Sequence, residues 1–217
     1  MITRRECLKL GVSALAALAI KPAWADRKVE RMKLGLVTYN LANKWDLATI
    51  IERCKATGFE GVELRTTHAH GVEPSLSKPE RQEVRKRFED SGIILWGLGS
   101  ICEFHQTDPA VVKQNVETCR DFVLLAEDLG AAGVKVRPND LQEAKGIPAQ
   151  KTLEQIGLAL NECGRFAADH GIEIWLEVHG PGTHHPPHIR TILDHCNHPS
   201  VGACWNSNQG DIKDGSV

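Results

Sequence analysis

From Lys33 onward, the chain alternates between short apolar runs and longer amphipathic segments. Short runs rich in β-branched and aromatic residues are typical of strands, and apolar residues spaced three and four apart are typical of helices with one buried face. Glycines follow most of the amphipathic segments, as expected where a helix ends. The pattern predicts strands at 33–39, 60–66, 93–102, 133–137, within 171–180 and at 201–205, and helices at 46–57, 78–91, 108–129, 150–170 and 188–196.

Regular alternation of strands and helices implies a parallel sheet covered by helices. An open doubly wound sheet usually has a glycine-rich turn after its first strand, but the segment 40–45 contains no glycine. Polar residues instead follow every predicted strand, which is typical of the α/β fold called the (β/α)₈ TIM barrel. We therefore expect a TIM-barrel type with about six βα units present, and an open six-stranded sheet is the alternative.

The length falls short of a whole barrel. A (β/α)₈ barrel needs eight units and typically about 250 residues, whereas this chain has 217. We therefore expect residues 33–217 to form a C-terminally incomplete barrel whose first and last strands have unpaired edges.

The N-terminus reads as an export signal spanning residues 1–25. A basic segment with paired arginines precedes an apolar run at Gly11–Ile20 and a small-x-small cleavage site at Ala23–Ala25. The apolar run is shorter than the roughly 20 residues that span a bilayer. The T-R-R-x-x-L-K pattern resembles a twin-arginine signal, with an ordinary secretory signal as the alternative. This predicts export by the twin-arginine translocase to the periplasm or beyond, no membrane anchor after cleavage, and a polar linker at 26–32.

Composition narrows the possible partners. The net charge of −2, with both signs interspersed, argues against a nucleic-acid partner. Six cysteines follow the signal, and none forms a C-x-x-C pair, so neither a zinc motif nor a redox motif is indicated. Most of these cysteines are expected to be small buried side chains.

Several chemically useful side chains stand at or near predicted strand ends. Glu177 and His179 close an apolar strand just before Gly180. Lys135 lies between two valines, so it should point into the barrel, where an unpaired ammonium is costly. Glu63 likewise lies between two apolar residues, Val62 and Leu64, and could be a partner for Lys135 or for a substrate.

The remaining histidines lie in predicted loops. His105 follows the third strand. His68 follows the second strand and could contact a substrate or be merely a polar loop residue. The H-H-x-x-H pattern at 184–188 contains two prolines, which argue against a helix there and favour a solvated loop over a metal site.

The L-E-V-H end of the fifth strand, Lys135, His105 and the W-N-S-N segment after the sixth strand resemble the xylose isomerase-like barrel superfamily, including its exported sugar phosphate isomerase/epimerase-like members. The resemblance implies one divalent cation held by Glu, Asp, His and Glu at the ends of strands five to eight. Glu177 matches the first ligand and Asn206 the second, where Asp is usual; the other two would fall beyond Val217. Mn²⁺ suits such a site best, with Mg²⁺, Co²⁺ and Zn²⁺ as alternatives.

The resemblance also implies a reaction. A metal-dependent sugar or polyol isomerase or epimerase would move a proton through an enediolate, with Glu177 as ligand and general base. The side chains expected to bind the small sugar-like substrate are His179, His105, Lys135, Glu63 and His68. Residues 1–217 alone would lack two ligands and be inactive. The alternatives are a non-catalytic carbohydrate-binding barrel and a relative of the type-four abasic-site endonucleases.

Overall fold

The computed structural model describes residues 31–207. The described residues from Lys33 onward belong to one compact unit. The predicted export signal and most of the linker at 26–32 lie outside the described residues.

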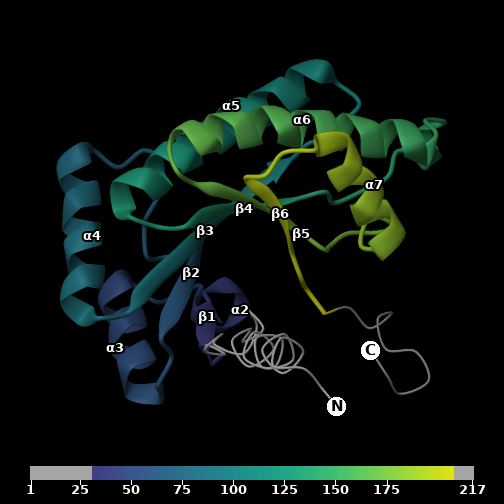
Figure 1. Cartoon of the computed structure of the whole chain (residues 1–217). Helices are drawn as coiled ribbons and strands as arrows, with labels where there is room; N and C mark the ends of the chain where they lie inside the picture. The colour runs from purple at the N-terminus through teal and green to yellow at the C-terminus, as the bar shows by residue number, and fades with distance from the viewer. Residues whose placement is uncertain (1–30, 208–217) are drawn as a thin grey trace, which may run out of the picture. The chain divides into compact units, whose positions relative to one another are not determined.

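The described part of the chain follows the predicted alternation of strands and helices (Figure 1). Its elements in order are β1 (Gly35–Val37), α2 (Tyr39–Ala42), α3 (Leu47–Thr57), β2 (Gly61–Arg65), α4 (Lys78–Ser91), β3 (Ile94–Glu103), α5 (Pro109–Leu129), β4 (Gly133–Arg137), the 3₁₀ turn η1 (Glu143–Lys145), α6 (Ala149–Asp169), β5 (Glu173–Glu177), α7 (Pro186–Cys196) and β6 (Val201–Cys204). The single turns α2 and η1 are too short to show a helical period and were not predicted. Within residues 31–207, no helix is both long enough and apolar enough to cross a bilayer.

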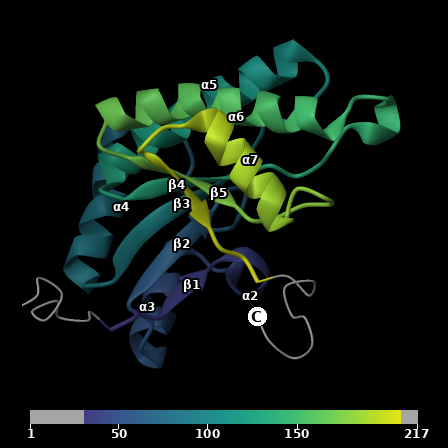
Figure 2. The ribbon, with the colours of Figure 1, turned by 45° about the vertical axis from the view of Figure 1, so that its right-hand side comes forward.

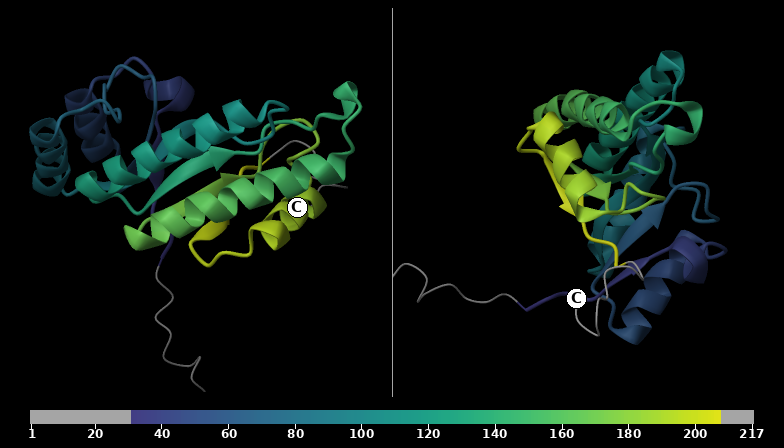
Figure 3. Two further views of the ribbon diagram at one scale, coloured as in Figure 1. Left: turned by 90° about the horizontal axis from the view of Figure 1, so that it is seen from above. Right: turned by 90° about the vertical axis from the view of Figure 1, so that its right-hand side faces the viewer.

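The six strands form one parallel sheet in the order β1-β2-β3-β4-β5-β6. The sheet is curved, and helices α3 to α7 lie along its outer side (Figures 1 and 2). Viewed from above, α5 and α6 run side by side over the sheet (Figure 3). This arrangement confirms the predicted TIM-barrel type. Among the described strands, β1 and β6 each pair on one side only.

Both ends of α3 follow the local rules for helix ends. Asp46 caps α3, since its carboxylate accepts a hydrogen bond of 2.8 Å from the backbone N–H of Thr49. Gly58 ends the same helix with a φ of 79°, in the left-handed region that glycine adopts without strain.

The predicted loop at 184–188 is wrong in its second half, because α7 begins at Pro186. The first backbone N–H groups of a helix have no intrahelical partner, so prolines at the first two positions lose no helical hydrogen bond. The flanking imidazoles bind the preceding turn: Nδ1 of His184 lies 2.7 Å from the Gly180 oxygen, and Nδ1 of His188 lies 2.8 Å from the Gly182 oxygen.

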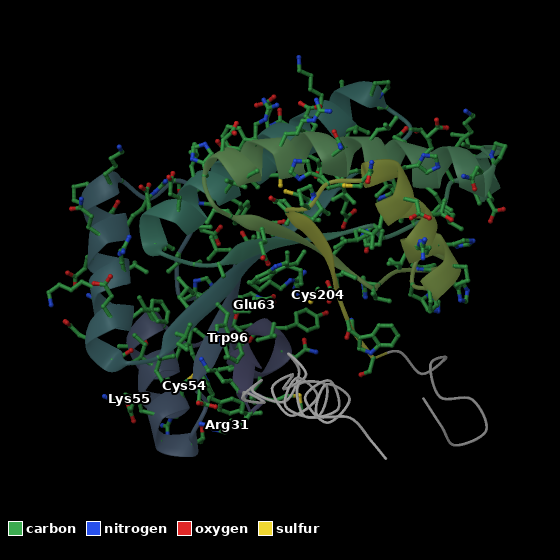
Figure 4. All side chains as sticks on the ribbon, viewed as in Figure 1. Arg31, Cys54, Lys55, Glu63, Trp96 and Cys204 are labelled. Carbon is green, nitrogen blue, oxygen red and sulfur yellow. The ribbon has the colours of Figure 1, made fainter. Side chains whose placement is uncertain are left out.

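The two faces of the sheet have different packing. The helix-facing side carries fully buried aliphatic side chains from every inner strand, including Leu64, Val134 and Leu176. On the concave side, the indole of Trp96 covers two positions without side chains, and an added Cβ at Gly35 would lie 1.8 Å from its ring (Figure 4). Trp175 covers Gly97 and Gly133 in the same way. The indoles thus fill the concave face at the level of these glycines and leave the carboxyl ends of the strands to polar groups.

All six described cysteines are free thiols, and every one except Cys204 is buried. Burial raises the pKa of Cys54 and raises that of Cys196 to about 11. These thiols act as small apolar side chains, as expected.

Candidate functional site

A cavity of about 410 Å³ opens at the carboxyl ends of the strands. All six strands or the residues just after them contribute to its lining: Val37, Tyr39, Glu63, Arg65, Ser100, Lys135, Arg137, Glu177, His179, Cys204, Trp205 and Asn206. Figure 4 labels two of these, Glu63 on β2 and Cys204 on β6. A second hollow of about 470 Å³ is lined by side chains of α5 and α6 and receives none from the strand ends.

The centre of the cavity is an ion triad. The ammonium of Lys135 lies 2.7 Å from Glu63 Oε1 and 3.5 Å from Glu177 Oε1, and the three side chains are only 11%, 11% and 15% exposed. Burial lowers the pKa of Lys135, but the two carboxylates more than offset this, so its pKa lies above the ordinary value. The structure therefore brings Lys135 and Glu63 together, which is one of the two roles considered for Glu63, and adds Glu177.

The triad reaches across a whole strand, because β3 lies between β2 and β4. Gly99 of β3 pairs with Lys135 and has no side chain to fill the gap. A Cβ at this position would lie 2.8 Å from Glu63 Oε1. Gly99 therefore leaves the space in which the carboxylate of Glu63 reaches Lys135.

Asn206 follows β6 and donates a hydrogen bond of 3.2 Å from Nδ2 to Glu177 Oε1. The two predicted metal ligands are thus neighbours in one cavity, and a carboxylate and an amide offer the oxygen donors that suit a hard cation. Residues 31–207 contain no group of three or more His, Cys, Asp or Glu side chains arranged to hold a metal ion. The pair therefore fits part of a metal site and does not form one by itself.

Two arginines in the lining were missed by the sequence reasoning. The guanidinium carbon of Arg65 lies 4.6 Å from the centre of the Tyr39 ring, a cation–π contact. Arg137 lies 3.4 Å from Glu103, which also accepts a hydrogen bond from Asn139. The sequence could have indicated both arginines, because alternate residues of a strand share one face. Arg65 stands two residues after Glu63, and Arg137 stands two residues after Lys135.

Of the three histidines predicted to bind a substrate, only one lines the cavity. His179 lines the cavity, whereas His68 and His105 are not among its lining residues. Nδ1 of His68 lies 3.1 Å from Thr38 Oγ1, and Nε2 of His105 lies 3.1 Å from Gln106 Nε2. Burial lowers the pKa of both His68 and His105. Their predicted contact with a substrate stays a prediction, without support from this geometry.

A curved parallel sheet with polar groups gathered at the carboxyl ends of its strands defines a β/α-barrel protein. Residues 51–208 match the family described as Xylose isomerase-like TIM barrel, and the chain belongs to that family. Among curated proteins, none matches this sequence.

Several solved structures share the fold. A D-psicose 3-epimerase in the presence of D-fructose aligns with a TM-score of 0.65 and 20% identity, over 80% of this chain and 63% of its own. A D-psicose 3-epimerase with D-tagatose from Clostridium cellulolyticum H10 gives 0.70 and 18%, over 86% and 67%. The IOLI protein with a bound zinc atom gives 0.64 and 19%, over 79% and 62%. The chain thus spans less than two thirds of the first and third of these relatives.

Proposed function

We propose that this chain carries the chemistry of a sugar or polyol isomerase or epimerase, which moves a proton next to a carbonyl through an enediolate. The observation that carries the proposal is the position of Glu177, a mostly buried carboxylate in the strand-end cavity within 3.5 Å of Lys135 and 3.2 Å of Asn206. Support also comes from the family and from the sugar 3-epimerases that share the fold.

The proposal includes one divalent cation, with Mn²⁺ as our first choice. Glu177 and Asn206 would hold it together with further donors. When bound, such a cation polarises carbonyl and hydroxyl oxygens of a sugar. Asn206 brings no charge where the family usually has Asp, so we expect weaker binding of the cation than a second carboxylate would give.

The three residues of the triad and His179 each have a part in the proposed reaction. Glu177 takes the proton from the carbon next to the carbonyl as a general base, and isomerisation follows when the resulting carboxylic acid delivers that proton to the former carbonyl carbon of the enediol. Lys135 presents a positive charge to the oxygen on which negative charge develops. Glu63 anchors the ammonium of Lys135, and His179 binds a substrate hydroxyl at the rim.

Hydrogen exchange tests this proposal. The full-length protein that contains residues 1–217 is incubated in deuterated water with Mn²⁺ and D-tagatose or D-fructose, and deuterium on the carbon next to the carbonyl is followed by NMR. We expect exchange that falls by about 10² or more in Glu177→Gln, the range for loss of a general base. The matched control is Glu173→Gln, at the exposed other end of the same strand.

Lack of exchange in the wild-type protein, or equal exchange in both variants, would refute the proposed reaction. Sugar binding without exchange would instead support a carbohydrate-binding barrel, which the uncharged Asn206 favours as the alternative.

We also propose that residues 1–25 direct export through the twin-arginine translocase, on the strength of Arg4-Arg5 and the apolar run after them. Cell fractionation of a bacterial host should find the wild-type chain in the periplasm and the Arg4→Lys/Arg5→Lys variant in the cytoplasm. Export of both would indicate an ordinary secretory signal instead.

A further inference from the structure

Arg65 is held in place at the carboxyl end of β2 from both sides of its backbone. Its N–H donates to Thr38 Oγ1 at 2.9 Å, and its carbonyl oxygen lies 2.8 Å from Nε2 of His70. The Tyr39 ring lies under the guanidinium, with 4.6 Å between the guanidinium carbon and the ring centre. Stacking leaves the N–H groups at the edge of the guanidinium plane able to donate, in a plane set before any ligand arrives.

Arg65 differs in its ion pairing from Lys135 and Arg137, the other cations that line the cavity. Lys135 is paired with two carboxylates, and Arg137 lies 3.4 Å from Glu103. Within the part of the chain that the structure describes, no carboxylate forms an ion pair with Arg65. A guanidinium that lines a cavity, stacks on an aromatic ring and forms no ion pair with a described carboxylate is suited to bind an anion.

We propose that this cavity takes a sugar acid, whose carboxylate is bound by the guanidinium of Arg65. This inference rests on the proposed assignment of the cavity as the substrate site. A planar guanidinium matches a carboxylate with two parallel hydrogen bonds, which are charge-assisted and directional. The uncompensated charge is that of one guanidinium, which balances one carboxylate and not a doubly charged phosphate. A cavity of about 410 Å³ is within the usual range for small ligands.

Binding of matched sugar pairs tests the inference. Isothermal titration calorimetry on the full chain compares D-galacturonate with D-galactose, and D-glucuronate with D-glucose, with D-glucose 6-phosphate as a third anion. In at least one pair, we expect the acid to bind about tenfold more tightly than the neutral sugar, because a charge-assisted pair replaces a neutral contact. In Arg65→Gln, the preference for the acid over the neutral sugar should fall to about twofold or less.

The control variant is Arg53→Gln, which makes the same change at an exposed position on α3 and should keep the preference. The inference is overturned by equal binding of acid and neutral sugar, by binding of neither, by tighter binding of the phosphate, or by an unchanged preference in Arg65→Gln. Its failure is distinct from failure of the proposed reaction, because hydrogen exchange on a neutral ketose does not require the carboxylate contact.

Discussion

Replacement of Lys135 by methionine removes an ammonium that lies between two mostly buried carboxylates. The distance of 2.7 Å to Glu63 corresponds to a Coulomb attraction of about 6 kcal/mol at an effective dielectric constant of about 20. The distance of 3.5 Å to Glu177 corresponds to about 5 kcal/mol on the same scale. These are gross attractions, and the loss of hydration on burial of all three groups opposes them.

The net loss of stability in Lys135→Met is therefore set by the two carboxylates that remain without a cation. Removal of one partner from a buried ion pair typically costs about 3–5 kcal/mol, because the remaining charge is unpaired. We expect Lys135→Met to lower the free energy of unfolding by about that much. The double variant Glu63→Gln/Lys135→Met should be more stable than Lys135→Met, because it leaves only the carboxylate of Glu177 without its cation.

Urea unfolding with linear extrapolation at pH 7 measures these differences between the wild type, Lys135→Met and the double variant. Because Lys135 has a raised pKa in the folded protein, its contribution is fully present below the unfolded lysine pKa near 10.4 and is lost as the pH rises through the folded value. A loss below about 1 kcal/mol in Lys135→Met, or a double variant no more stable than the single one, would refute the ion-triad reasoning.

Three further predictions concern Gly99, Asn206 and His70, of which His70 lies outside the cavity lining. Gly99→Ala should push the carboxylate of Glu63 away from its partner and cost about 1–3 kcal/mol in urea unfolding. Gly202→Ala, where nothing lies within 4 Å of the added Cβ, should cost less; equal losses would contradict this account. Asn206→Asp should bind Mn²⁺ about tenfold more tightly by calorimetry, because it adds a charge, and weaker binding would argue against a cation there. Burial lowers the pKa of His70, whose Nδ1 accepts a backbone N–H, so stability should fall as the pH drops below about 6.5. Unfolding at pH 7 and pH 5 should show a smaller fall in His70→Gln, and an equal fall would exclude this cause.

The local pattern of apolar and polar residues was sufficient to predict the fold and to indicate the residues at the centre of the candidate site. The strand and helix periods predicted the βα alternation, because side-chain direction repeats every two residues in a strand and about every 3.6 in a helix. The same parity placed Glu63 and Lys135 on the inner face before any contact was known, and the end of an apolar strand marked Glu177.

Tertiary structure alone decided which of these side chains meet and which stand apart. Strand register and sheet curvature bring together residues far apart in the sequence. They determine the contact between Lys135 and Glu177, the stacking of Arg65 on Tyr39 and the packing of Trp96 against glycines. The loop histidines show the same limit, since His68 and His179 both follow strands and yet only His179 lines the cavity. A loop's course is set by the elements it joins, and no local period encodes it.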